Sequence, residues 1–211
     1  MNKKEIKVIV PANPGWLQYK LNTQEMDYVW RCIKNKKGNT NKTLAGNISA
    51  SYDLMDRSDW FWLNVISPLE RRYTDEFRNL GEKLPIKIKH PYYLSKWWVN
   101  YQKQNEFNPA HNHTGVYSFV IWMKIPYDSR KQNQKDIARN SNAPLIGDFQ
   151  FMYSNMLGAS DNYSYRMNPD LEGTLLFFPA QLEHQVYPFY DCDEERISVS
   201  GNIMVDTSRK L

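Results

Sequence analysis

The second half of the chain alternates apolar and polar residues, whereas the first part mixes several patterns. From about residue 85 onward, many of the apolar positions are aromatic or β-branched and recur with a period of two. This period predicts strands that bury one face. The expected strands are 96–102, 116–125, 149–153, 173–178 and 196–205. Repeated short strands predict a mainly β fold, a sandwich or jelly roll, over residues 85–211.

Residues 1–84 are expected to be mixed and partly helical. A short strand is expected at 6–10, and Asn22 with Glu25 forms a capping-box pattern before a helix at 23–34. A second helical pattern covers 59–80, where Ser67-Pro68 indicates either two helices or one kinked helix. We expect the helices to pack outside the β core and the 211 residues to form one domain. The polar stretch 127–143 is expected to be a mobile loop.

Composition narrows the class of protein only modestly. Hydrophobic residues make up 41% of the chain and aromatic residues 14%, which is sufficient for a packed core. The formal net charge of +4 is too small to require an anionic partner, and basic and aromatic residues form no stripe typical of nucleic-acid binding. We therefore expect no nucleic-acid partner. No segment has the length and apolarity of a membrane span. Two cysteines without CxxC spacing favour a reducing cytoplasm.

The most informative chemistry lies in three of the four histidines. His111 and His113 are separated by one residue, so an extended segment would direct both imidazoles to the same side. His184 follows the strand-like run 173–178, and a ligand at the end of a second strand could complete a three-point face for a metal. His90 stands beside Pro91, away from the other three, and is interpreted as a structural residue.

The last predicted strand carries a polar face that begins with an arginine. Its polar positions alternate with mostly apolar ones and are Arg196, Ser198, Ser200 and Asn202. A solvent-facing edge strand would give the same pattern. However, Arg196 follows His184 by only 12 residues, which would place a guanidinium fork beside the histidines. Such a fork matches the geometry of a carboxylate.

These segments resemble the Fe(II)- and 2-oxoglutarate-dependent oxygenases, specifically those encoded by tailed phages and bacteria. The resemblance covers residues 94–204 and is carried by Trp97–Gln102, Glu106–Gly115 with Ser118–Ile121, Gly173–Pro179, His184 and Arg196–Ser198. It implies a double-stranded β-helix, a form of jelly roll, with Fe(II), 2-oxoglutarate and O2 as cofactor and co-substrates. It also implies that the histidines hold iron, that Arg196 binds the distal carboxylate of 2-oxoglutarate, and that Ser198 assists. Asn100 and Gln102 share one strand face and are further candidates for binding the co-substrate, together with Asn202.

The chain departs from the commonest motif of that superfamily, in which His-x-Asp or His-x-Glu supplies a carboxylate ligand. Here the corresponding residue is His113, which leaves the site more positive by about one charge. We favour His111, His113 and His184 as the ligands. Alternatively, His113 orients the site while water or a carboxylate, such as Asp148 or Glu183, completes it. Neutral nitrogen ligands also suit Zn, Ni or Cu.

The expected activity is hydroxylation of a C–H bond in a peptidyl residue, such as proline, or in a small metabolite, with release of succinate and CO2. Two other classes remain open: a jelly-roll module that binds a ligand without catalysis, and a three-histidine dioxygenase that does not use 2-oxoglutarate. The sequence contains no phosphate-binding glycine loop, no GxSxG motif and no Cys/His nucleophile arrangement. Trp97, Trp98 and Tyr101 are expected to pack in the core.

Overall fold

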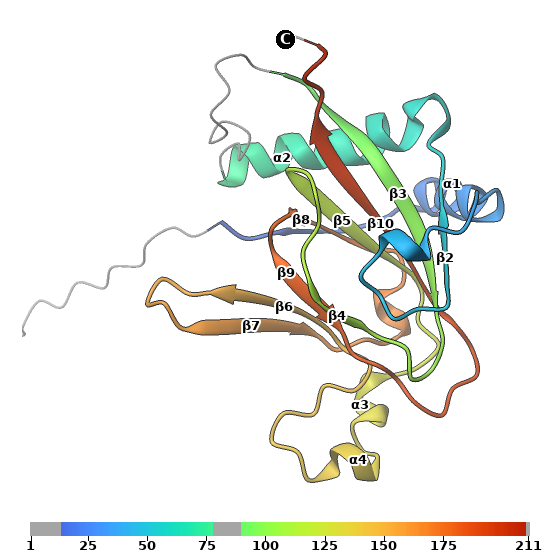
Figure 1. Ribbon diagram of the computed structural model, residues 1–211, viewed down its shortest axis with the longest axis vertical. Helices are drawn as coiled ribbons and strands as arrows, with labels where there is room; N and C mark the ends of the chain where they lie inside the picture. Colours follow the sequence, from blue (N-terminus) through green and yellow to red (C-terminus); the bar gives the residue numbers. More distant parts are fainter. Residues whose placement is uncertain (1–13, 78–89, 210–211) are drawn as a thin grey trace, which may run out of the picture.

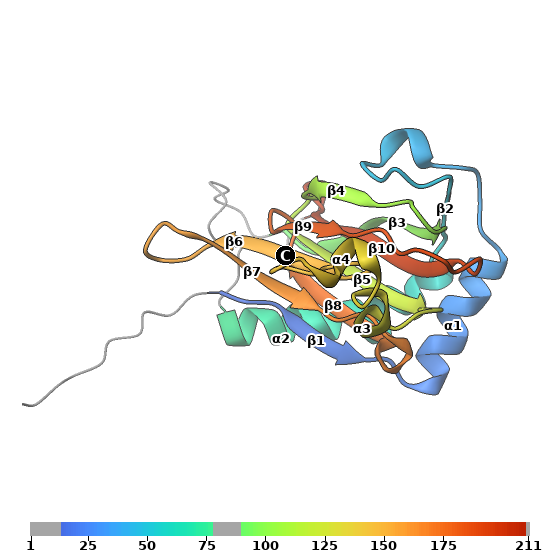
Figure 2. The ribbon, with the colours of Figure 1, turned by 90° about the horizontal axis from the view of Figure 1, so that it is seen from below.

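The protein folds into two antiparallel β-sheets that face each other, with helices on the outside of the larger sheet (Figures 1 and 2). The computed structural model describes residues 14–77 and 90–209. The strands are β1 (Leu17–Lys20), β2 (Ala50–Asp53), β3 (Tyr92–Gln102), β4 (Asn108–His111), β5 (Tyr117–Lys124), β6 (Phe149–Ser154), β7 (Ser160–Tyr165), β8 (Thr174–Pro179), β9 (Glu183–Val186) and β10 (Arg196–Val205). The helices are α1 (Thr23–Lys34), α2 (Ser67–Phe77), α3 (Ser129–Gln132) and α4 (Asp136–Arg139).

The larger sheet has the strand order β1-β8-β5-β10-β3-β2, and the smaller sheet has the order β4-β9-β6-β7. Strand β10 pairs with β5 on one side and with β3 on the other, so the polar face predicted for this strand lies at the centre of a sheet rather than at an edge. The mainly β, jelly-roll architecture is confirmed, and it is the double-stranded β-helix that the family resemblance implied.

The alternation along the strands separates two hydrophobic cores. One face of the larger sheet packs against α1 and α2, and Val29 and Tyr73 from the helices belong to the same hydrophobic core as Val199 and Ile203 from β10. Its other face, which includes Trp122, packs toward the smaller sheet. Polar residues of β10 also point into the space between the sheets, where the candidate site lies.

The first helix spans the predicted residues, and a capping box defines its start: the Asn22 side chain accepts from the Glu25 backbone N–H, and the Glu25 carboxylate accepts from the Asn22 N–H. The second helical segment is continuous through Ser67 and changes its helix type before it. Trp62–Ile66 is a π-helical turn that leads directly into α2, so Ser67 is a link between two helical segments rather than a free N-cap. Pro68 has no N–H to donate, and the wider turn before it accommodates its ring.

Other expectations differ in detail. Segment 127–143 is not one loop, because it contains α3 and α4 and the Gln132 side chain is fixed to the backbone of Tyr190. The strand expected at 6–10 and the helical pattern at 78–80 lie outside the described residues. Strands 96–102, 116–125, 149–153 and 173–178 are found with ends shifted by at most four residues, and 196–205 is found as predicted.

Candidate functional site

A cavity of about 240 Å³ lies between the two sheets. The larger sheet lines it with the polar face of β10 and with Trp98, Asn100 and Gln102 from β3. The smaller sheet and the segment after β4 contribute His111, His113 and His184. Residues that were far apart in the sequence and singled out for separate reasons therefore share one cavity.

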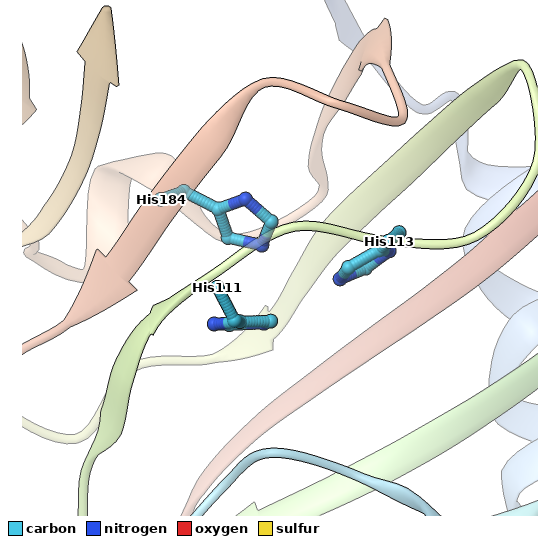
Figure 3. A group of neighbouring side chains, drawn as sticks. All are labelled: His111, His113 and His184. Carbon is cyan, nitrogen blue, oxygen red and sulfur yellow. The ribbon is translucent and has the colours of Figure 1, made fainter.

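The three histidines converge on one point of this cavity, as Figure 3 shows. His111 ends β4 and pairs directly with His184 of β9, while His113 follows two residues later. One ligand nitrogen from each ring lies within 4.8 Å of the other two. The run at 173–178 forms β8 in the larger sheet, and His184 follows that strand in the sequence without being part of it. It belongs to the separate strand β9 of the smaller sheet.

Hydrogen bonds at Nδ1 fix the tautomer of at least two of these rings. His111 Nδ1 lies 2.7 Å from the Pro109 carbonyl oxygen, and His184 Nδ1 lies 3.0 Å from the Leu182 carbonyl oxygen. A carbonyl only accepts, so each Nδ1 carries the hydrogen and each Nε2 keeps a lone pair. His113 Nδ1 contacts the Ser118 hydroxyl. The Nδ1 atoms of the three rings are thus hydrogen-bonded to two backbone carbonyls and one hydroxyl. Hydrogen bonds of this kind orient metal-binding imidazoles in proteins.

Burial favours the neutral form of all three rings. Burial lowers the pKa of His113 to about 4; the neighbouring His111 acts in the same direction, and hydrogen bonding of the His113 ring to the Asn202 side chain opposes it. Burial also lowers the pKa of His111 and, together with the two neighbouring imidazoles, lowers that of His184 well below its usual value. The group therefore offers three neutral nitrogen ligands at neutral pH.

Arg196 is 3% exposed and extends from the start of β10. Its guanidinium donates to the Tyr127 hydroxyl at 2.8 Å, to the Gly147 carbonyl at 3.3 Å and to Gln102 Oε1. Its buried Nε has no hydrogen-bond partner in the described part of the chain, and no carboxylate there forms an ion pair with it. A buried cation held only by neutral groups is suited to an anionic ligand.

The other predicted site residues occupy different places around the cavity. Ser198 lines it beside Arg196. Both ends of the Gln102 side-chain amide are hydrogen-bonded. The nitrogen donates to the Glu106 carbonyl at 2.6 Å, and the oxygen accepts from Arg196. Asn100 accepts from the Ser51 hydroxyl at 2.7 Å, and Asn202 donates to Thr114. Gln102 thus positions the arginine, and Asn202 lines the cavity next to Ser118.

Neither alternative carboxylate reaches the histidine group within the described residues. Asp148 is fully buried and forms an ion pair with Arg166 at 2.7 Å. Glu183 is exposed on β9, while its neighbour His184 is buried. Adjacent strand residues point to opposite faces, so Glu183 faces away from the cavity.

The sequence did not reveal several residues that shape the site. Ser118 and Tyr127 contact His113 and Arg196, respectively, and segment 41–48 of the N-terminal part lines the cavity. The only sequence signal for Ser118 is the alternation in 116–125, which places it on the same strand face as Val120. Trp98 is buried, as expected, but it also lines the cavity.

A protein-family model described as "Putative 2OG-Fe(II) oxygenase" matches residues 96–202, about half of the chain. The chain belongs to this family of 2-oxoglutarate- and Fe(II)-dependent oxygenases. It is therefore an enzyme of the oxidoreductase class, and the family implies Fe(II), 2-oxoglutarate and O2. A search of curated protein sequences found no match.

Solved structures with the same fold include further 2-oxoglutarate enzymes. A prolyl-4-hydroxylase from Pseudomonas putida is 15% identical with a TM-score of 0.53, covering 90% of this chain and 92% of that one. The viral collagen prolyl hydroxylase of Paramecium bursaria Chlorella virus 1 is 14% identical with a TM-score of 0.50, covering 89% and 94%. The carbocyclase SnoK from nogalamycin biosynthesis is 10% identical with a TM-score of 0.54, covering 92% and 80%. These likenesses establish the fold. Within the described residues, no helix is long and apolar enough to span a bilayer.

Proposed function

We propose that this oxygenase holds one Fe(II) ion with His111, His113 and His184. The observation that carries the proposal is the convergence of three neutral imidazoles whose Nδ1 atoms are all engaged by hydrogen bonds. This leaves the Nε2 lone pairs as the available donors. Such a donor set fits iron, although it also suits nickel, copper and zinc. The choice of iron therefore comes from the family rather than from the ligands.

In this proposal, Arg196 binds the distal carboxylate of 2-oxoglutarate. Support comes from its burial, its vacant Nε and the neutral character of its partners. Ser198 lines the cavity beside it and is positioned to add a hydroxyl donor, while Gln102 and Tyr127 keep the guanidinium in one orientation. A three-histidine dioxygenase that does not use 2-oxoglutarate would leave this buried cation without an anionic partner, so we favour 2-oxoglutarate.

When bound, iron and 2-oxoglutarate supply the oxidative chemistry of the family, in which O2 is consumed, succinate and CO2 are released and a substrate C–H bond is hydroxylated. The side chains of this chain perform the supporting tasks. The three histidines fix the position of the reacting centre, and Arg196 fixes one end of the co-substrate. Trp98, Trp122 and Phe149 line the cavity with apolar surface that excludes water.

We further propose that the substrate is uncharged near the reacting carbon, either a peptidyl residue such as proline or a small metabolite. Among the described residues that line the cavity, the only ionisable ones are the three histidines and Arg196. Once these bind metal and co-substrate, the remaining polar residues of the lining carry neutral amides and hydroxyls: Asn41, Thr43, Ser51, Asn100, Gln102, Asn108, Asn112, Thr114, Ser198, Ser200 and Asn202. Two structural neighbours are described as prolyl hydroxylases, which agrees with a peptidyl substrate.

The two parts of the chain, residues 1–84 and 85–211, are proposed to form one functional domain. Segment 41–48 from the first part lines the cavity whose ligands come from the second. We also propose a cytoplasmic location, which agrees with the absence of a disulfide between the free Cys32 and Cys192.

The substrate proposal is tested by incubating the Fe(II)-loaded enzyme with 2-oxoglutarate, O2 and matched peptides that differ only at the central residue. We expect a proline-containing or other neutral peptide, or a neutral metabolite, to gain one oxygen atom by mass spectrometry. His184→Ala serves as the inactive control. Preferential oxidation of peptides with a central lysine or aspartate would contradict the proposal.

A further inference from the structure

Ser118 is fully buried on β5 and contacts His113, the one candidate ligand whose Nδ1 does not meet a backbone carbonyl. The His111 and His184 rings are held by carbonyl oxygens two residues earlier in the chain, at Pro109 and Leu182. These acceptors belong to the backbone and are present whatever the side chains are. The orientation of His113 depends instead on a side chain from a neighbouring strand.

The other partners of the Ser118 hydroxyl show which group donates the hydrogen bond between Ser118 and His113. The hydroxyl oxygen lies 2.7 Å from the Gly201 carbonyl oxygen and 3.1 Å from Asn202 Oδ1, and both of these atoms only accept. The Asn202 amide group is itself oriented, because its nitrogen donates to Thr114 Oγ1 at 3.1 Å. The single hydroxyl hydrogen is therefore directed to β10, and the oxygen presents lone pairs to His113.

We infer that Ser118 is a positioning residue that holds His113 in the Nδ1–H tautomer and thereby presents the Nε2 lone pair to the cavity. A neutral imidazole carries one N–H, and its location is decided by the better acceptor. Without the serine oxygen, Nδ1 loses its hydrogen-bond acceptor on β5, and the Nε2–H form, which occupies the atom needed for a metal, becomes more populated. The tautomer itself follows from the local contacts, whereas its effect on metal binding rests on the proposed iron site.

The consequence is specific to this chain, because His113 occupies the place where related enzymes commonly carry a carboxylate. A carboxylate offers lone pairs in every orientation, whereas an imidazole at this position binds metal only when its tautomer is set. Loss of a partner of this kind typically weakens metal affinity by about 10- to 100-fold. We expect Ser118→Ala to fall in that range.

The test uses the full-length, metal-free protein labelled with ¹⁵N-histidine. Long-range ¹H–¹⁵N correlation spectra at neutral pH report the tautomer of each ring, and His113→Gln identifies the signals of His113. Calorimetric titration with Co(II) then measures metal affinity. Ser118→Thr and Ser118→Val form a matched pair, since they have nearly the same shape and differ in the hydroxyl. Ser164→Ala, which removes a hydroxyl bonded to Gln150 on the smaller sheet, is the control.

We expect the Nδ1–H form of His113 in the wild type, in Ser118→Thr and in Ser164→Ala. In Ser118→Ala and Ser118→Val, the Nε2–H form should grow and Co(II) affinity should fall. An unchanged tautomer in both variants that lack the hydroxyl would overturn the inference, as would the Nε2–H form in the wild type. If the tautomers behave as expected but the wild type does not bind Co(II), the role of Ser118 is supported and the proposed metal site fails.

Discussion

Replacement of Arg196 by methionine gives the sharpest prediction about the co-substrate. Methionine keeps much of the length and volume of the side chain but removes the guanidinium. Arg196 is 3% exposed, and its Nε has no partner in the described residues. Removing one member of a buried charge pair costs about 2–5 kcal/mol. Since about 1.4 kcal/mol corresponds to a tenfold change in Kd, affinity for 2-oxoglutarate should fall at least about 30-fold.

The assay is calorimetric titration of 2-oxoglutarate into protein loaded with Ni(II), which permits binding to be measured without turnover. Arg72→Met is the matched control, because Arg72 is exposed on α2 and, within the described residues, forms an ion pair only with Glu76. Urea unfolding of both variants separates a binding defect from a loss of folding. Wild-type affinity in a folded Arg196→Met variant would refute the assignment of Arg196 to the distal carboxylate.

Three further predictions test other parts of the account. His184→Ala should abolish stoichiometric metal binding in calorimetry, whereas Glu183→Ala, on the opposite face of β9, should retain it. Loss of metal binding in Glu183→Ala would show instead that a carboxylate is one of the ligands. Burial lowers the pKa of His113 to about 4 in the folded protein, whereas an ordinary histidine has a pKa of about 6.5. As pH falls below about 6.5, the unfolded chain therefore binds more protons than the folded one, and the metal-free protein should lose stability. For His113 alone the loss approaches about 3 kcal/mol at low pH, and a urea midpoint that stays constant between neutral pH and pH near 5 would contradict it. Gly201→Ala should destabilise the fold by about 1–3 kcal/mol, since its Cβ would lie 2.5 Å from Phe119 Cε1, whereas Gly38→Ala, with nothing within 4 Å, should be nearly neutral in the same unfolding assay.

Local signals in the sequence predicted the parts of the fold that depend on neighbouring residues. The capping box predicted the first residue of α1, and the alternation of polar and mostly apolar residues from Arg196 predicted both ends of β10. The same alternation predicted which face of β10 would be polar, and that face lines the cavity. These patterns were sufficient because each one is contained within a dozen residues.

The smaller sheet was harder to predict because its strands are short and partly polar. Strand β4 has four residues and contains Pro109, and β7 is mostly exposed. Their pairing depends on contacts between distant segments, such as His111 opposite His184. For the same reason, the sequence suggested which histidines could meet but not that Ser118 and Tyr127 would hold His113 and Arg196.

Formation of succinate from 2-oxoglutarate tests the central claim most directly. Anaerobically purified protein is reconstituted with Fe(II), mixed with 2-oxoglutarate and exposed to O2, with the proposed substrate class present and absent. We predict succinate formation that requires both Fe(II) and O2 and disappears in His184→Ala and Arg196→Ala. Stoichiometric metal binding without 2-oxoglutarate binding or succinate would contradict the account.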